Sequence, residues 1–100
     1  MNSKIIYDLN EIKRRLDPVF SANDVKSAIL FGSYAQGYAT SDSDIDILVD
    51  SGLRGLDFVG LVENAREALQ KDVDIVDTYY VLQDSPIKHV ALTTGVRIYG

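Results

Sequence analysis

The sequence of 100 residues contains no cysteine, only two prolines and a single histidine. The lack of cysteine excludes a disulfide framework, a zinc site built on thiolates and a cysteine nucleophile, and it is compatible with a reducing compartment. No hydrophobic run approaches the ~20 residues of a membrane-spanning helix, and the charged N-terminal stretch lacks the apolar core of a secretory signal. These absences predict a cytoplasmic protein without a membrane anchor.

Positive charge is also scarce. Ten Lys and Arg residues stand against fifteen Asp and Glu residues, which gives a formal net charge of -5. The negative electrostatic field of such a chain repels phosphate backbones, so direct nucleic-acid binding is not expected. Any phosphate ligand must be bound by a few groups at one local site. Apolar residues make up 46% and charged residues 25% of the chain, as in ordinary globular proteins. The length predicts one domain over residues 1–100.

Apolar spacing predicts three helices. The first covers about residues 3–16, with Ser3 as its N-cap and Pro18 as its stop, because four apolar residues recur at helical spacing: Ile5, Leu9, Ile12 and Leu16. A second helix is predicted at about 57–70, after the Gly-rich connection at 51–55.

The third helix is predicted near the C-terminal end of the sequence. Asp84 or Ser85 can cap a helix that has Pro86 at its first position and Gly95 just past its end. A last short strand, "VRIY", would follow this helix.

Three further segments read as strands. "KSAILF" at 26–31 is a short apolar run closed by Gly32, and "DIDILVD" at 44–50 and "DVDIVD" at 72–77 alternate acidic and apolar residues. In 44–50, alternation sends Ile45, Ile47 and Val49 to the core. Helices alternating with three to four strands predict an α/β or α+β fold with a single mixed sheet flanked by helices. The order of the strands does not follow from the sequence.

Four aspartates gather in "ILFGSYAQGYATSDSDIDILVD", residues 29–50. Asp44 and Asp46 alternate on one strand, so their side chains point to the same face with Cα atoms about 6.6 Å apart. Such a pair repels unless a divalent cation lies between the carboxylates. Hard oxygen ligands suit Mg²⁺, with Mn²⁺ as the alternative ion.

Two common motifs with similar spacing are excluded. Asp42, Asp44 and Asp46 match the first positions of an EF-hand, but Ile47 stands at the sixth position and Leu53 at the twelfth, where the motif needs Gly and Glu. Gly32 and Gly37 have P-loop spacing, but Tyr38 and Ala39 follow them in place of Lys and Ser or Thr.

The remaining pattern is Gly32-Ser33, ten intervening residues, and Asp44-Ile45-Asp46. It resembles the nucleotidyltransferase superfamily of DNA polymerase β type. Within it, the likeness is closest to the minimal nucleotidyltransferases, small antitoxin-like partners of HEPN-domain toxins, whose signature is G-S-x10-D-x-D. The resemblance covers nearly the whole chain and implies a polymerase β-like fold.

The resemblance also implies a third carboxylate on a neighbouring strand. Asp74 matches it best, because it lies mid-strand between residues that face the core, and Asp72 is the reserve choice. Asp77 points to the opposite face of a regular strand. The implied metal ligands and catalytic residues are therefore Asp44, Asp46 and Asp74.

Nucleotide binding is predicted at the turn, by Gly32, Ser33 and Gln36, together with Asp44 and Asp46. Gly32 lets a phosphate approach the backbone, and Ser33 offers a hydroxyl and an N–H at the start of a short helix. Gln36 stands where members of the family usually have an Arg that contacts the triphosphate, and Gln cannot supply that charge. Either nucleotide affinity is lower, or another cation takes over; the candidates are Lys26, Arg54, Lys71 and Arg97.

By this resemblance, the protein is a metal-dependent nucleotidyltransferase of a toxin–antitoxin system. Asp44 and Asp46 would bridge two Mg²⁺ ions, with Asp74 helping to hold one of them. The implied reaction transfers AMP from ATP to the hydroxyl of a tyrosine in a HEPN-type toxin and releases pyrophosphate. A hetero-oligomer with that toxin is implied as well.

The alternative is a catalytically inactive fold that neutralises its toxin by binding alone. Gln36 favours this alternative, whereas the retention of all three aspartates disfavours it. Enzymes that nucleotidylate small molecules have the same kind of active site, but they normally need an added domain to hold the molecule. The length of this sequence disfavours that function.

Overall fold

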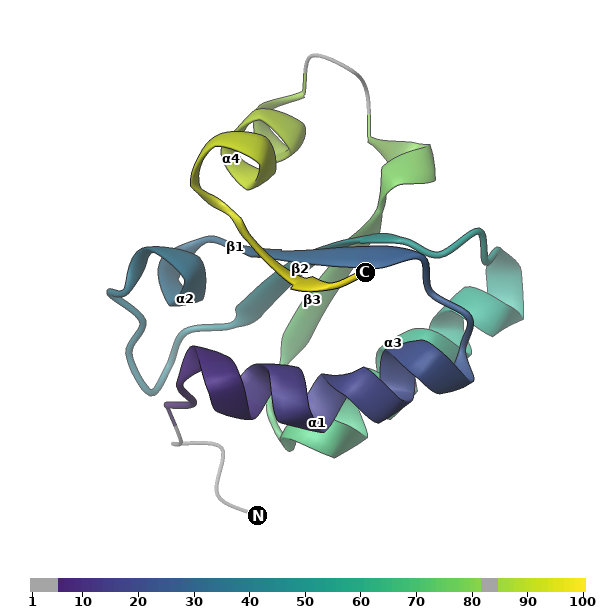
Figure 1. Cartoon of the computed structure of the whole chain (residues 1–100), viewed down its shortest axis with the longest axis horizontal. Helices are drawn as coiled ribbons and strands as arrows, with labels where there is room; N and C mark the ends of the chain where they lie inside the picture. The colour runs from purple at the N-terminus through teal and green to yellow at the C-terminus, as the bar shows by residue number, and fades with distance from the viewer. Residues whose placement is uncertain (1–5, 82–84) are drawn as a thin grey trace.

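The computed structural model of the chain describes residues 6–81 and 85–100. Helices and strands alternate along most of the chain, and their bounds are α1 Leu9–Ala22, β1 Ser27–Phe31, α2 Ser33–Gln36, β2 Ile45–Asp50, α3 Gly55–Leu69, β3 Val73–Asp77, the 3-10 helix η1 Thr78–Tyr80, α4 Pro86–Thr94 and β4 Val96–Tyr99. Figure 1 shows α1 and α3 side by side on one face of the sheet and α4 on the other.

The sheet has four strands in the order β3-β2-β1-β4. β1 pairs antiparallel with both β2 and β4, whereas β2 and β3 run parallel and are joined through α3. A parallel pair needs such a crossover because a tight turn can join only antiparallel neighbours. The predicted single mixed sheet flanked by helices is confirmed.

The core lies between the sheet and the α1–α3 layer. Ile45, Ile47 and Val49 of β2 are completely buried, as the alternation predicts. The helices cover them with six residues that are also completely buried: Ile12, Leu16, Phe20, Leu61, Ala65 and Leu69. At about 1.5–3 kcal/mol for each fully buried large apolar side chain, this layer is the main source of stability.

The prediction for the first helix is wrong at both ends. α1 begins at Leu9 after Asp8, whose carboxylate accepts the backbone N–H of Glu11 at 2.8 Å; Ser3, the predicted cap, lies outside the described residues. The helix also continues through Pro18 to Ala22. An interior proline costs about 3 kcal/mol, but the turn beyond it buries Phe20 completely against the core, with its ring 5.3 Å from that of Tyr99.

The other helices lie close to their predicted positions. α3 begins at Gly55, two residues before the predicted start and inside the predicted connection. α4 has Pro86 at its first turn and Gly95 as its C-cap, and the Ser85 hydroxyl accepts the N–H of Lys88 at 3.1 Å. Asp84, the other candidate cap, is outside the described residues. None of the helices in 6–81 and 85–100 combines the length and apolar character that crossing a bilayer requires.

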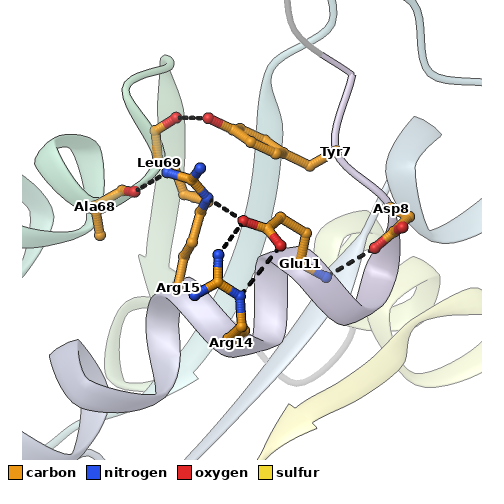
Figure 2. Close-up of polar contacts among 7 residues, drawn as sticks. All are labelled: Tyr7, Asp8, Glu11, Arg14, Arg15, Ala68 and Leu69. Carbon is orange, nitrogen blue, oxygen red and sulfur yellow. Dashed lines mark hydrogen bonds and ion pairs between the residues drawn. The ribbon is translucent and has the colours of Figure 1, made fainter.

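Side chains near α1 hold the C-terminal end of α3 (Figure 2). Tyr7 donates its hydroxyl to the carbonyl of Leu69 at 2.6 Å, and Arg15 donates to the carbonyl of Ala68 at 3.0 Å. Arg15 also bonds Glu11 at 2.7 Å and lies 4.8 Å from the centre of the Tyr7 ring. These donors satisfy carbonyls that have no partner within the helix. They therefore fix the turn that leads from α3 into β3.

Candidate active site

The glycine-serine turn lies directly after β1. Gly32 is the N-cap of α2 and has φ of 76° and ψ of -153°, a combination that is essentially restricted to glycine. A Cβ at this position would lie only 2.5 Å from Oδ2 of Asp46. The short helix predicted to begin at Ser33 is present as α2. Glycine is thus required here both by the backbone conformation and by the approach of the Asp46 carboxylate.

The register of the sheet brings Asp46 and Asp74 together. Asp46 pairs with Phe31 on the β1 side and with Asp74 on the β3 side. Neighbouring strands lie about 4.8 Å apart, and paired residues in a ladder project to the same face. Asp44 precedes the strand by one residue and is exposed, like Asp74, whereas Asp46 is half-buried between them. The three predicted carboxylates therefore gather at one end of the parallel pair β2–β3.

The carboxylate of Asp46 has a higher pKa than an ordinary aspartate. The pKa of Asp46 is raised from its ordinary value of 3.8 to about 6, and burial is the largest cause. The negative charges of Asp74 and then Asp44, and a hydrogen bond with Asp74, account for the rest of this rise. Both neighbouring charges disfavour ionisation of Asp46, so the cluster is destabilised at neutral pH when no cation is bound.

The chemistry of the donor set fits a hard divalent cation. Carboxylate oxygens are the preferred ligands of Mg²⁺ and Mn²⁺, and a cation relieves the repulsion around Asp46. As the side chains stand, residues 6–81 and 85–100 contain no group of three or more His, Cys, Asp or Glu residues that could hold a metal ion. Asp44 and Asp74 are exposed, so their side chains can reorient toward an ion.

Of the four cations considered as substitutes for the usual Arg, Lys71 lies beside the motif. It lines a cavity of about 140 Å³ together with Asp44 and three other polar residues: Ser41, Asp42 and Asp72. Arg54 instead stacks 3.5 Å from the centre of the Tyr79 ring. Arg97 borders a different cavity, and Lys26 precedes the opposite end of β1. Gln36 itself is exposed on α2.

Asp77 turns away from this cluster, as the alternation predicts. It is 2% exposed and accepts hydrogen bonds from the backbone N–H and the hydroxyl of Ser51 and from the N–H of Tyr79. This buried network could not be predicted from the sequence, because Ser51 lies in the predicted connection at 51–55.

Comparison with known proteins identifies the class. The sequence pattern of the family described as "Polymerase beta, Nucleotidyltransferase" matches residues 14–100. Two relatives come from Methanocaldococcus jannaschii. "Putative protein adenylyltransferase MJ0435" is 44% identical over 71 residues, which cover 69% of this chain and 76% of the relative. "Putative protein adenylyltransferase MJ1379" is 33% identical over 78 residues, which cover 73% of this chain and 78% of the relative.

Solved structures agree with this class. A toxin–antitoxin crystal structure with AMP-PNP has a TM-score of 0.76 and 28% identity, covering 88% of this chain and 73% of the other. A "putative minimal nucleotidyltransferase" has a TM-score of 0.73 and 28% identity, with coverage of 90% and 95%. A Shewanella oneidensis complex of tri-AMPylated HEPN toxin with MNT antitoxin, at 24% identity, shares the fold with a TM-score of 0.70 over 92% and 72% of the chains.

These matches define a nucleotidyltransferase with the polymerase β-like fold. The chain belongs to the polymerase beta nucleotidyltransferase family, and it is similar to the minimal nucleotidyltransferases within that fold.

Proposed function

We propose that this protein is an antitoxin-type protein adenylyltransferase. It transfers AMP from ATP to a tyrosine hydroxyl of a HEPN-type toxin and releases pyrophosphate. The proposal rests on one observation: Asp46 pairs with Asp74 across β2 and β3, and its carboxylate lies against the backbone of Gly32. The turn that we propose to bind phosphate and the carboxylates that we propose to hold metal thus lie at the same end of the sheet, which supports the proposal.

Each residue of the site has a distinct role in this proposal. Gly32 leaves room for a phosphate to approach the backbone, and Ser33 donates through its N–H and hydroxyl. Asp44 and Asp46 would hold two Mg²⁺ or Mn²⁺ ions, and Asp74 would complete the ligands of one of them. When bound, such ions neutralise the triphosphate, activate the attacking hydroxyl and stabilise the leaving oxygen.

The bond changes are those of an in-line displacement. The tyrosine oxygen of the partner forms a bond to the α-phosphorus of ATP, while the bond from that phosphorus to the β-phosphate oxygen breaks. The tyrosine proton leaves to water, and pyrophosphate departs. Gln36 contributes at most a neutral hydrogen bond to the triphosphate, so nucleotide affinity is expected to be modest.

The partner is inferred from the relatives. The structure with AMP-PNP is described as a toxin–antitoxin pair, and the curated relatives are named as protein adenylyltransferases. Both descriptions support a protein acceptor and a nucleotide donor. A hetero-oligomer with the toxin, in the cytoplasm, is part of the proposal.

The second candidate is a protein that neutralises its toxin by binding alone. Gln36 is the observation that favours it, since the cation expected at that position is absent. The two candidates differ in whether the carboxylates are needed, so a single experiment separates them.

The experiment uses the neighbouring gene product as acceptor and four nucleoside triphosphates labelled at the α-phosphate, each with Mg²⁺. Wild type is expected to label the partner from ATP, and the double variant Asp44→Asn, Asp46→Asn is not. Asp50→Asn is the matched control, because it removes one carboxylate from the same strand at its opposite end. Absence of transfer by wild type, with toxin bound and inhibited by both proteins, would establish the binding module instead.

A further inference from the structure

Lys71 is a buried cation at the junction between α3 and β3. The residue is 7% exposed, and its ammonium donates to the backbone carbonyl of Ser41 at 2.8 Å. The two residues are 30 positions apart in the sequence, so this contact joins distant segments. A buried ammonium is costly unless it is hydrogen-bonded and paired with negative charge.

Ser41 belongs to a compact turn that comes just before Asp44. Within the turn, the N–H of Thr40 donates to the Ser43 hydroxyl at 2.9 Å, and the N–H of Ser43 donates to the carbonyl of Thr40 at 3.0 Å. On the other side of Asp44, the N–H of Ile45 donates to the carbonyl of Asp72 at 3.2 Å. Residues 71 and 72 therefore tether the chain both before and after Asp44.

Charge supports the same arrangement. Lys71 lines a cavity of about 140 Å³ together with Asp42, Asp44 and Asp72. Residues of opposite charge around one cavity make the burial of an ammonium less costly. The segment that bears Asp44 is thus held by the hydrogen bond from Lys71 and lies beside a positive charge.

We propose that Lys71 is a positioning residue: it holds the turn of Asp44 against β3 and thereby sets the geometry in which Asp44 joins Asp46 and Asp74 at a metal ion. The inference rests on the proposed function, because it takes Asp44 as a metal ligand. Lys71 acts through Asp44 and is not itself expected to contact the reacting atoms.

Two effects of removing Lys71 have opposite signs, which makes the proposal testable. If Lys71 acted only as a nearby positive charge, its removal would tighten the binding of a divalent cation. If it holds Asp44 in place, its removal weakens that binding, since loss of a partner that orients a ligand costs about 10-fold to 100-fold in metal affinity.

The test measures the Kd of Mn²⁺ by electron paramagnetic resonance on the full chain, without nucleotide or partner. Lys71→Met is expected to weaken binding about 10-fold. Lys26→Met removes the same charge next to the far end of β1 and is expected to leave the Kd within about twofold, because exposed charges at that distance are screened. Lys71→Arg keeps the charge and the donors, so it should recover part of the affinity.

Hydrogen exchange of the backbone amides of residues 42–45, measured without metal, is the second readout. Lys71→Met is expected to accelerate this exchange, and Lys26→Met is not. Should Lys71→Met fail to fold, Lys71→Gln replaces it. The Gln side chain is neutral like that of Met, but it ends in a polar amide, one atom short of the position of the Lys71 ammonium.

An unchanged or tighter Mn²⁺ Kd in the Lys71 variants overturns the inference, and so does unchanged exchange. If wild type itself does not bind Mn²⁺, the metal site of the proposed function fails, whereas the exchange rates still decide whether Lys71 tethers the turn.

Discussion

The strands β2 and β3 have aspartates at both ends, and the two ends are opposite in character. At one end, Asp77 is buried and accepts three hydrogen bonds, two from Ser51 and one from Tyr79. At the other end, Asp46 faces the negative charges of Asp74 and Asp44. A carboxylate whose partners are all within the protein stabilises the fold. A cluster whose members repel one another is instead suited to an external cation.

The largest expected effect is on stability at the Asp77 end. Asp77→Ala is expected to lower the free energy of unfolding by about 3 kcal/mol, because the two buried donors of Ser51 and the partly buried N–H of Tyr79 lose their acceptor. Asp74→Ala, at the exposed end of the same strand, should change it by less than about 0.5 kcal/mol. Urea denaturation monitored by circular dichroism measures both. Equal losses for the two variants would remove the distinction between the ends.

Gly32→Ala tests the contact between the turn and the cluster. The substitution is expected to cost about 2 kcal/mol of stability, because it combines an unfavourable backbone conformation with a contact to the Asp46 carboxylate. Gly37→Ala is the matched control: φ there is also positive, at 87°, but a Cβ meets nothing within 4 Å. Thermal unfolding should show the smaller loss for Gly37→Ala, about 1 kcal/mol. A reversed order would contradict the close approach of Asp46.

Asp46→Asn probes the cost of ionising Asp46, which comes first from burial and then from the neighbouring charges, through its pH dependence. Since folding raises the pKa of Asp46 from 3.8 to about 6, ionisation costs stability, and this cost grows as pH rises from 3.8 to 6. Without metal, the variant is expected to gain about 1 kcal/mol over wild type above pH 6, after allowance for solvent screening, and to lose this gain near pH 4.

Denaturation at a series of pH values measures this difference, with Asp50→Asn as the control on the same strand. A gain that does not depend on pH would show that ionisation of Asp46 carries no cost in the folded protein.

The smallest expected effect concerns Gln36. Gln36→Arg restores a cation at the position where the family usually has one, and it is expected to tighten ATP binding about fivefold, close to 1 kcal/mol. Gln36→Met, which is neutral and of similar length, should not. Isothermal titration with ATP and Mg²⁺ measures the Kd, and weaker binding by Gln36→Arg would place the triphosphate away from α2.

Patterns that are local in the sequence predicted the fold well. The alternation in β2 identified Ile45, Ile47 and Val49 as core residues, and the start and end signals of α4 were correct. Pro18 misled the prediction for α1, because a local stop signal was outweighed by the burial of Phe20 beyond it. Strand order depends on contacts between distant segments, so the sequence could not supply it.

The residues of the candidate site, too, could be predicted where the pattern is local in the sequence, but not where distant segments meet. The spacing of Asp44 and Asp46 was visible in the sequence, and alternation put Asp74 on the face opposite to Asp77; in the sheet, Asp74 pairs with Asp46. The contact of Lys71 with the carbonyl of Ser41 involves no side-chain pattern, so no sequence signal pointed to it. The catalytic and metal-binding roles of these residues remain predictions that the experiments above address.

The change from antiparallel to parallel pairing at β2 has a consequence for the order of assembly during folding. β1 and β2 are separated only by α2 and the following turn, so Gly32 and Asp46 meet through a connection that closes quickly. Asp74 is joined to β2 through the longer connection that contains α3, and a longer connection closes more slowly. We therefore expect Gly32 and Asp46 to come together early in folding, and Asp74 to approach Asp46 only later, when the core beneath them is packed.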